Sequence, residues 1–255
     1  MISIITICFN AKKTIARTFD SILEQVFLPA EYIIIDGMST DGTLDIINQY
    51  RLLFIEKGIS LKVVSEKDNG LYDAMNKGVK LVSQEWVHFL NSDDFYVNKY
   101  VLSSIHQQLI NIKEDIVYGR IIKEKNGSQS IQYDIKEKHL KLNMLSGCPI
   151  SQPATFFRTN LLMHKYSFDT TYKISADYKL YVEMINNKER FKFIPYFVTC
   201  FDENGISSIN KDGLVVEENI RLLKECGHTT VFIQLSKNKK CFKLYSLLIE
   251  FISRF

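Results

Sequence analysis

The chain has 255 residues, of which 46% are hydrophobic and 24% are charged, and its formal net charge at pH 7 is +3. This composition is typical of a globular protein that buries a core. The net charge is far below the positive excess of a typical nucleic-acid-binding protein, which argues against that class. The five cysteines are scattered without C-x-x-C spacing, which argues against a zinc site and indicates a reducing compartment.

The sequence predicts neither export nor a membrane span. The apolar first residues lack a basic leader and a cleavage site, so we expect a strand there and not a signal peptide. No run approaches the ~20 apolar residues that cross a bilayer. We therefore expect a cytoplasmic protein.

The first part of the chain alternates predicted strands and helices. Short apolar runs rich in β-branched or aromatic residues predict strands at residues 2–9, 32–35, 61–64 and 86–90. Apolar residues at helical spacing predict helices between them, at residues 12–26, 43–47 and 71–82. Alternation at these short intervals predicts an α/β fold, a mostly parallel sheet with helices on both faces.

Polar residues follow each of these four strands at its C-terminal end: Asn10, Asp36, Asp68, and then the pair Asp93 and Asp94. Ligands bind at this edge of an α/β sheet, because the loops there gather groups from several strands. Adjacent aspartates stay ionised at low cost when they are solvated or share a cation, and their oxygens suit Mg²⁺ or Mn²⁺. A solvated turn that caps the next helix explains the pair taken alone. Repetition at four strands favours a binding site.

After residue 94 the strict alternation stops. We expect a helix at residues 101–109, and then two strands at 115–124 and 130–135 around Asn126-Gly127, a strong hairpin turn. The remaining predicted elements are a basic loop at 136–146, a strand at 154–158, a helix at 175–185 with Ser175 as its cap residue, a strand at 191–201, a polar turn at 205–208 and a helix at 215–226.

The last segment, residues 241–255, carries apolar and aromatic residues on one helical face, and lysines precede it. A basic lead before an aromatic-rich amphipathic helix is what an interfacial membrane anchor requires. A helix packed on the domain or on a second subunit explains the same pattern equally well. Both interpretations stay open.

Five stretches together resemble a family-2 inverting glycosyltransferase of the GT-A fold. They are DGMSTDGT (residues 36–43), SEKDNGLYDAMNKG (65–78), LNSDD (90–94), QPATFF (152–157) and ADY (176–178). The resemblance covers residues 1–208 and is greatest to the bacterial branch that builds O-antigen, capsule or similar surface polysaccharides. It implies a GT-A, Rossmann-like domain at 1–208, with a nucleotide-binding half at about 1–98 and an acceptor half at about 99–208. A helical extension at 209–255 follows.

The resemblance also implies roles for particular residues. The enzyme would transfer a sugar, with inversion, from a nucleotide-diphosphate donor (usually a UDP-sugar) to a glycan or lipid-linked sugar. Asn10 and Asp36 would hold the base and ribose, with Asp68 on the same rim. Asp93 occupies the last position of the family's D-x-D metal motif and Asp94 follows it, so a bound Mn²⁺ or Mg²⁺ is expected on this pair. The first position is Asn91 here, which leaves open which aspartate is the main ligand. Asp177 matches the family's catalytic base.

Other residues are weaker candidates. Lys77 and Arg158 are considered for phosphate contacts, although a solvated surface role is expected for both, and His88 is expected to be a packed core histidine. No glycine-rich loop follows the first strand, which argues against an NAD-dependent dehydrogenase or a sugar nucleotidyltransferase. A calcium loop at 36–47 is rejected because Ile47 stands where the closing Glu belongs. The substitution by Asn91 keeps a non-catalytic partner subunit as an alternative. Peripheral contact with the cytoplasmic face of the inner membrane is expected if the tail is an anchor.

Overall fold

The computed structural model describes residues 1–131, 134–145, 147–148, 150–203 and 213–228. The polar turn expected at 205–208 and the tail helix expected at 241–255 lie outside the described residues. Within the described residues, no helix is both long enough and apolar enough to cross a membrane.

Nine strands of the described chain form one sheet. Its order is β3 (Ser60–Ser65), β2 (Glu31–Asp36), β1 (Ile2–Cys8), β4 (Trp86–Phe89), β8 (Thr155–Arg158), β6 (Ile116–Lys125), β9 (Phe191–Asp202) and β5 (Phe95–Tyr96), with β7 (Ser128–Ile131) paired to β6. The four strands β3, β2, β1 and β4 are parallel, as the sequence predicts. Their carboxyl ends therefore lie at one edge of the sheet.

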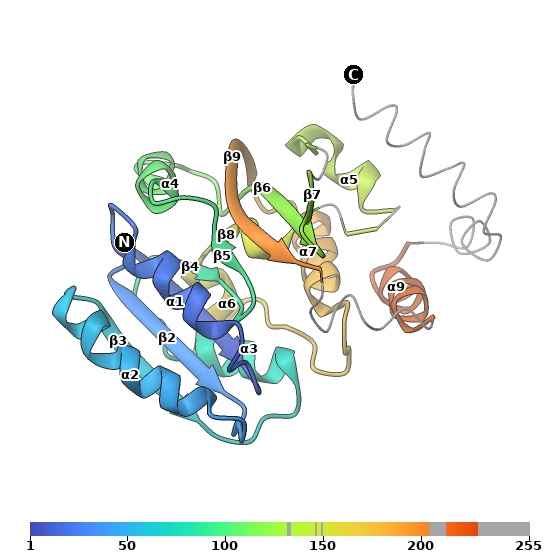
Figure 1. Ribbon diagram of the computed structural model, residues 1–255. Coiled ribbons are helices and arrows are strands. Elements are labelled where there is room, and N and C mark those ends of the chain that lie inside the picture. The colour runs from blue at the N-terminus through green and yellow to red at the C-terminus, as the bar shows by residue number, and fades with distance from the viewer. Residues whose placement is uncertain (132–133, 146, 149, 204–212, 229–255) are drawn as a thin grey trace.

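The second half of the sheet returns to the same edge by a different route. β8 is antiparallel to both β4 and β6, and β9 is parallel to β6. The carboxyl ends of β6 and β9 consequently lie at the edge where β1 to β4 end. Figure 1 shows the long, curved β9 lying along β6.

Helices cover both faces of the sheet (Figure 1). One face packs against α1 (Ile15–Leu23), α2 (Thr43–Glu56) and α4 (Val101–Leu109). The other packs against α3 (Leu71–Val79), α5 (Leu140–Asn143), α6 (Thr159–His164), α7 (Ala176–Asn186) and α9 (Leu214–Glu225). Side chains of β1 alternate between the two layers, with Ile4 on the α1 face and Ile5 on the α3 face. This period of two explains why the strand is apolar throughout.

Two glycines are needed where the backbone allows no ordinary side chain. Asn126 and Gly127 have φ values of 50° and 79°, and Lys125 pairs with Ser128, so the predicted two-residue hairpin is confirmed. At Gly119 a Cβ would lie 2.7 Å from the backbone oxygen of Tyr196. β9 can therefore approach β6 closely at the point where their register shifts.

One local prediction is wrong. Residues 136–146, expected as a loop, contain η1 (Glu137–His139) and α5, because buried Leu140 and Met144 supply an apolar face that the basic composition conceals. Ser175 is the N-cap residue of α7 as expected, although its hydroxyl makes no capping hydrogen bond to the described part of the helix.

The expectation for His88 is confirmed. The side chain is fully buried, Nδ1 lies 2.9 Å from the Tyr96 hydroxyl, and Nε2 lies 2.9 Å from the backbone oxygen of Pro153. Its ring stacks on Phe156 at 4.3 Å. Burial lowers the pKa of His88 to about 4, so the imidazole is neutral at physiological pH.

Candidate active site

The loops after β1 and β2 are joined by hydrogen bonds around Asn10 and Asp36. The Asn10 side-chain oxygen accepts from the Thr40 N–H at 2.9 Å, while the Asn10 N–H donates to the Ser39 hydroxyl at 2.8 Å. Asp36 is fully buried and accepts from the Ser39 N–H and, at 2.6 Å, from the Ser65 hydroxyl. Side chains from three strand ends therefore meet at one place.

Asp68 lies against this group. A Cβ at Gly37 would be 2.5 Å from Asp68 Oδ2 and 3.3 Å from the Phe9 ring, so glycine is what allows these chains to meet. Burial raises the pKa of the Cys8 thiol, and the nearby charges of Asp36, Asp41 and Asp68 raise it further. Three acids thus surround the end of β1.

Phe9 was not singled out by the sequence, because it reads as the last residue of an apolar strand. The structure ends β1 at Cys8 and leaves Phe9 60% exposed beside the Asn10–Asp36–Asp68 group. An exposed aromatic ring next to polar acceptors offers one flat apolar face and several hydrogen-bonding groups. Such a surface suits a planar, polar ring such as a nucleobase.

Asp93 and Asp94 follow β4 at the same edge but differ in burial. Asp94 is fully buried, and its carboxylate accepts from the Asp202 N–H and the Asn91 side-chain amide, both at 3.4 Å. Asp93 is partly buried. Burial raises the pKa of both carboxyls, and the charge of Asp93 raises that of Asp94 further. Burial and the repulsion between the two carboxylates therefore both oppose ionisation of the pair.

Asp202 and Arg17 complete this group and were not predicted. Asp202 ends β9, and its carboxylate lies 4.0 Å from the Arg17 guanidinium. Arg17 also donates to the Asp93 backbone oxygen at 3.4 Å and lies 4.1 Å over the Phe95 ring. The rule that polar residues at strand ends form the site would have found Asp202 had it been applied to the predicted strand at 191–201.

The donor set fits a divalent cation. Asn91 Oδ1 is buried and has no hydrogen-bond partner among the described residues. With the Asp93 and Asp94 carboxylates nearby, the available atoms are hard oxygens, which Mg²⁺ and Mn²⁺ prefer. Within the described ranges no three His, Cys, Asp or Glu side chains are already grouped as metal ligands. One or two carboxylates together with substrate phosphates are the usual environment of Mg²⁺.

Asp177 lies in the first turn of α7 and is partly buried. Its Oδ1 accepts from the Tyr72 hydroxyl at 3.2 Å and from the Tyr178 N–H at 2.8 Å. Burial raises the pKa of Asp177 to about 6, although these two hydrogen bonds lower it. A carboxylate with this pKa is ionised at neutral pH and can still take up a proton.

The topology brings the predicted residues to one edge of the sheet. Asn10, Asp36 and Asp68 are in one group, and Asp93 and Asp94 are in a second group at the ends of β4 and β9. Asp177 reaches the same edge through Tyr72, the second residue of α3, whose helix starts just after Asp68. No contact among the described residues joins Asp177 directly to either acidic group.

Lys77 and Arg158 are engaged elsewhere. Lys77 forms ion pairs with Glu66 at 2.9 Å and Asp73 at 3.6 Å, which stabilise the loop before α3. Arg158 pairs in register with Trp86, at the start of β4, and also contacts Glu85. Arg158 is therefore at the opposite edge of the sheet from the candidate site.

Comparison with known proteins identifies the family. The model for glycosyl transferase family 2 matches residues 3–181. The chain belongs to this family. A glycosyltransferase of PGL/p-HBAD biosynthesis from Mycobacterium tuberculosis is 30% identical over 216 residues, covering 84% of this chain and 78% of the relative. The chain is therefore an enzyme, a family-2 glycosyltransferase.

Another relative and two solved structures are similar to this chain over a shorter region or at lower identity. The Escherichia coli UDP-Glc:alpha-D-GlcNAc-diphosphoundecaprenol beta-1,3-glucosyltransferase WfaP is 34% identical over 109 residues, 42% of this chain and 40% of the relative. The structure of Staphylococcus aureus TarS 1–349 with UDP has a TM-score of 0.69 at 20% identity, and the match covers 88% of this chain and 64% of that chain. The mannosyltransferase PcManGT from Pyrobaculum calidifontis, with GDP-Man and Mn²⁺, has a TM-score of 0.67 at 16% identity, covering 99% and 73%. These similarities confirm the GT-A fold.

Proposed function

We propose that this glycosyltransferase moves a sugar, with inversion, from a UDP-sugar to a glycan or lipid-linked sugar in the synthesis of a bacterial surface polysaccharide. The observation that carries the proposal is Asp177, a single carboxylate with a pKa of about 6 at the sheet edge where the acidic groups lie. Inversion in one displacement needs one general base, on the side of the sugar opposite the leaving group.

The donor nucleotide is assigned to the group formed by Asn10, Asp36 and Asp68. Carboxylates fixed by neighbouring hydroxyl and N–H groups are suited to accept hydrogen bonds from ribose hydroxyls and from a base N–H. The exposed ring of Phe9 beside them provides a stacking surface. The complex of TarS with UDP, a protein of the same fold, is consistent with a UDP donor.

The leaving diphosphate is assigned to the second group. Asp93 and Asp94 would hold Mn²⁺ or Mg²⁺, with the Asn91 oxygen as a further donor. When bound, the cation supplies positive charge that stabilises the leaving diphosphate. Arg17, which lies beside Asp93 and Asp202, places a permanent positive charge at the same position.

The proton from the acceptor hydroxyl is assigned to Asp177. Its raised pKa increases its strength as a base while leaving it ionised above pH 6. The Tyr72 hydroxyl and the Tyr178 N–H orient the carboxylate by holding Oδ1, so Oδ2 is the oxygen we assign to the proton.

The acceptor class is proposed from the relatives. By their names, one acts in PGL/p-HBAD biosynthesis and another transfers glucose to a diphosphoundecaprenol-linked sugar. An acceptor carried on a membrane lipid would require the enzyme to work at the inner membrane surface. We propose peripheral contact on its cytoplasmic face, through the basic amphipathic segment at 241–255.

A thermal-unfolding screen tests the donor and the metal together. UDP with Mn²⁺ or Mg²⁺ should raise the midpoint temperature of unfolding more than UDP alone, because ligands that bind the native state stabilise it. UDP-glucose, UDP-GlcNAc and UDP-galactose are then compared with GDP-mannose. If a GDP-sugar stabilises the protein and no UDP-sugar does, the proposed donor is wrong. If neither ion increases the stabilisation that UDP gives, the proposed role of the metal is wrong.

A further inference from the structure

Helix α9 lies beyond residue 181, where the family match ends, yet it holds the segment in front of Asp177. The Glu218 carboxylate accepts hydrogen bonds from three consecutive backbone N–H groups, those of Lys173 at 2.7 Å, Ile174 at 3.0 Å and Ser175 at 2.9 Å. Glu218 is only 6% exposed. Three N–H donors satisfy a buried carboxylate and fix the chain that carries them.

This contact fixes the chain that leads into α7, through N–H groups that precede the first residue of the helix. A helix starts with unpaired N–H groups, and in a capping box a Glu of the same helix accepts from the N–H of the residue before the first turn. Here that residue is Ser175, and the acceptor comes from a different helix, 43 residues later in the chain. The start of α7, and Asp177 with it, is therefore attached to α9.

The same segment is attached to α3 on its other side. The Tyr72 hydroxyl donates a hydrogen bond to the Ile174 backbone oxygen and also lies 3.2 Å from Asp177 Oδ1. Ile174 thus has its N–H bound to α9 and its oxygen bound to α3. The residues leading into Asp177 are held between the two helices.

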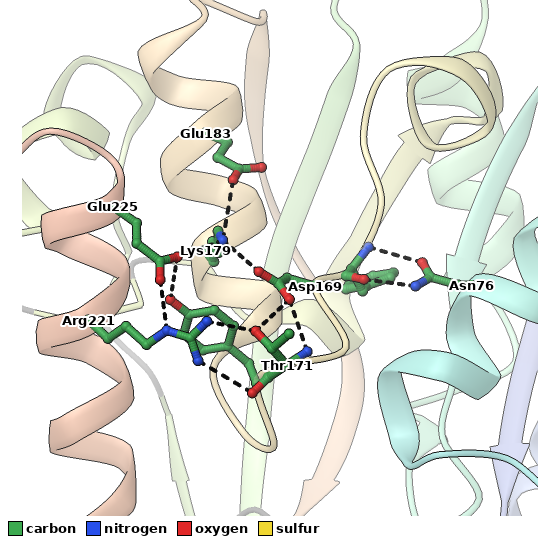
Figure 2. Close-up of polar contacts among 9 residues, drawn as sticks. Asn76, Asp169, Thr171, Lys179, Glu183, Arg221 and Glu225 are labelled. Atoms are coloured by element: carbon green, nitrogen blue, oxygen red, sulfur yellow. Dashed lines mark hydrogen bonds and ion pairs between the residues drawn. The ribbon is translucent and has the colours of Figure 1, made fainter.

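A second, more exposed attachment lies beside the first. Figure 2 shows Lys179 of α7 between Asp169 and Glu225, at 2.6 and 2.8 Å, and Arg221 of α9 reaching Thr171. The Arg221 side chain is 45% exposed, so water screens its interactions and we expect them to contribute little. Glu218 is the buried carboxylate of this interface between α9 and the loop at 169–175, whereas Glu225 is more exposed.

We propose that Glu218 is a positioning residue of the transfer reaction, and that it sets both the place of Asp177 and the electrostatic surroundings of its carboxylate. The proposal rests on the proposed function of Asp177 as the base. It assigns to α9, a helix outside the family-defining motifs, a direct influence on catalysis.

The electrostatic part follows from the groups whose charge or dipole acts on Asp177. Among the described residues, those that interact with it electrostatically include Tyr72 from α3, Cys148 from the loop after α5, Tyr181 from α7 itself and Glu218 from α9. Burial is the main cause of the raised pKa of Asp177, the Tyr72 and Tyr178 hydrogen bonds lower it, and the negative charge of Glu218 raises it. Removing that charge should therefore lower the pKa of Asp177.

The experiment compares Glu218→Gln with Glu217→Gln in the full chain. Glu217 is exposed on the same helical turn, so the control removes the same charge without touching the segment before α7. The pKa of Asp177 is followed by ¹³C NMR of its carboxyl carbon, assigned by its absence in Asp177→Asn. Turnover is followed as UDP release from the UDP-sugar that gives the largest thermal protection, and UDP affinity is measured by calorimetry.

Glu218→Gln should lower kcat about 10- to 100-fold, because a displaced base loses its alignment with the acceptor. The pKa of Asp177 and the acid limb of the pH–rate profile should both move to lower pH, while UDP affinity stays at the parental value. Glu217→Gln should match the parent in all three. Tyr72→Phe removes a hydrogen bond that lowers the pKa of Asp177, and so should move the acid limb to higher pH.

Parental kcat and an unmoved acid limb in folded Glu218→Gln would overturn the proposal. An equal loss of UDP affinity and kcat would also overturn it, because that pattern reports general damage. If Glu218→Gln does not fold, Glu218→Asp keeps the charge on a shorter side chain and should lower kcat with the acid limb unchanged. Loss of the fold in both variants would assign Glu218 to stability alone. If Asp177→Asn retains full turnover, the proposed base itself fails, which is a separate result.

Discussion

The donor side and the base side of the candidate site are built from contacts of different range. On the donor side, the loops that carry Asn10 and Asp36 are joined by hydrogen bonds between residues close in sequence. Asn10 and Thr40, for example, are 30 residues apart. On the base side, Asp177 is bound to Tyr72, 105 residues earlier, and the residues before it are bound to Glu218. The donor side thus depends on contacts between neighbouring loops, and the base side depends on contacts between elements far apart in the chain.

This difference has consequences for function. The Asn10–Asp36–Asp68 group follows from the parallel strands β1, β2 and β3, whose loops point to one edge, whereas the Asp93–Asp94 pair also needs Asp202 at the end of β9. The base side needs α3, α7 and α9 to be packed together. Changes on the base side should therefore affect turnover while leaving nucleotide binding intact, and changes in the Asn10–Asp36–Asp68 group should lower UDP affinity.

The largest expected effect that tests this separation is that of Asp177→Asn. The variant has no group that can accept the proton, so kcat should fall by about 10²- to 10⁴-fold. UDP affinity should stay at the parental value, because no contact joins Asp177 to the donor group among the described residues. Single-turnover assays and calorimetry measure the two quantities, and a matching loss of UDP affinity would break the separation.

A second prediction concerns His88, which joins β4 to Tyr96 of β5 and to the Pro153 backbone oxygen just before β8. Its pKa is about 4 in the fold against 6.5 when unfolded, so the unfolded chain binds more protons between these values. The stability from neutral His88 is therefore complete above pH 6.5 and is lost as pH falls towards 4. The loss is about 3 kcal/mol in the free energy of unfolding.

Urea unfolding of the parent and of His88→Gln, at several pH values from 7.5 to 4.5, measures this contribution. The variant starts from a lower stability, since glutamine cannot reproduce both hydrogen bonds and the stacking on Phe156. Its stability should nevertheless fall less steeply over this interval. Parallel curves for the two proteins would show that His88 does not titrate as described.

A third prediction addresses the donor side through Gly37→Ala. The new Cβ would lie 2.5 Å from Asp68 Oδ2, so Asp68 or the loop must move. We expect this displacement to lower UDP affinity about tenfold, which corresponds to about 1.4 kcal/mol of binding free energy. Gly58→Ala is the control: it has positive φ and no atom near its Cβ, so it should cost stability without changing UDP affinity. Equal UDP affinity in both variants would contradict the prediction.

The smallest expected effect is that of Arg221→Ala on the exposed attachment. Arg221 contacts Glu225 and Thr171 near the surface, and such pairs contribute less than about 1 kcal/mol. Both the unfolding midpoint in urea and kcat should remain close to the parental values. A loss as large as that expected for Glu218→Gln would show that the exposed contacts, and not the buried carboxylate, hold the base segment.

The sequence predicts the donor side well because its signals are local. An apolar run that ends in Asp36 or Asp93 shows both the strand and the edge at which it stops, and the parallel order follows from short crossovers. The family resemblance then placed Asp177. The hairpin at Asn126-Gly127 is confirmed as well, because both residues have the positive φ that such a turn requires.

The contacts of the base side could not be predicted from the sequence, because they join residues that are distant in the chain. Glu218 is one of two adjacent acids near the start of α9, next to the exposed Glu217, and only the fold shows which of them is buried. Phe9 was hidden by the strand before it. Tyr72 falls inside a recognisable motif, but no periodicity indicates that its hydroxyl reaches Ile174.

The position of α9 bears on where this protein can be cut. Residues 1–208 contain every recognisable motif, and a fragment ending there would preserve all of the carboxylates assigned to chemistry. It would also strip three backbone amides of their acceptor and uncover the apolar surface on which Leu222 and Leu223 rest. A fragment meant to keep Asp177 in place should therefore extend at least to Glu225, beyond residue 181, where the family match ends.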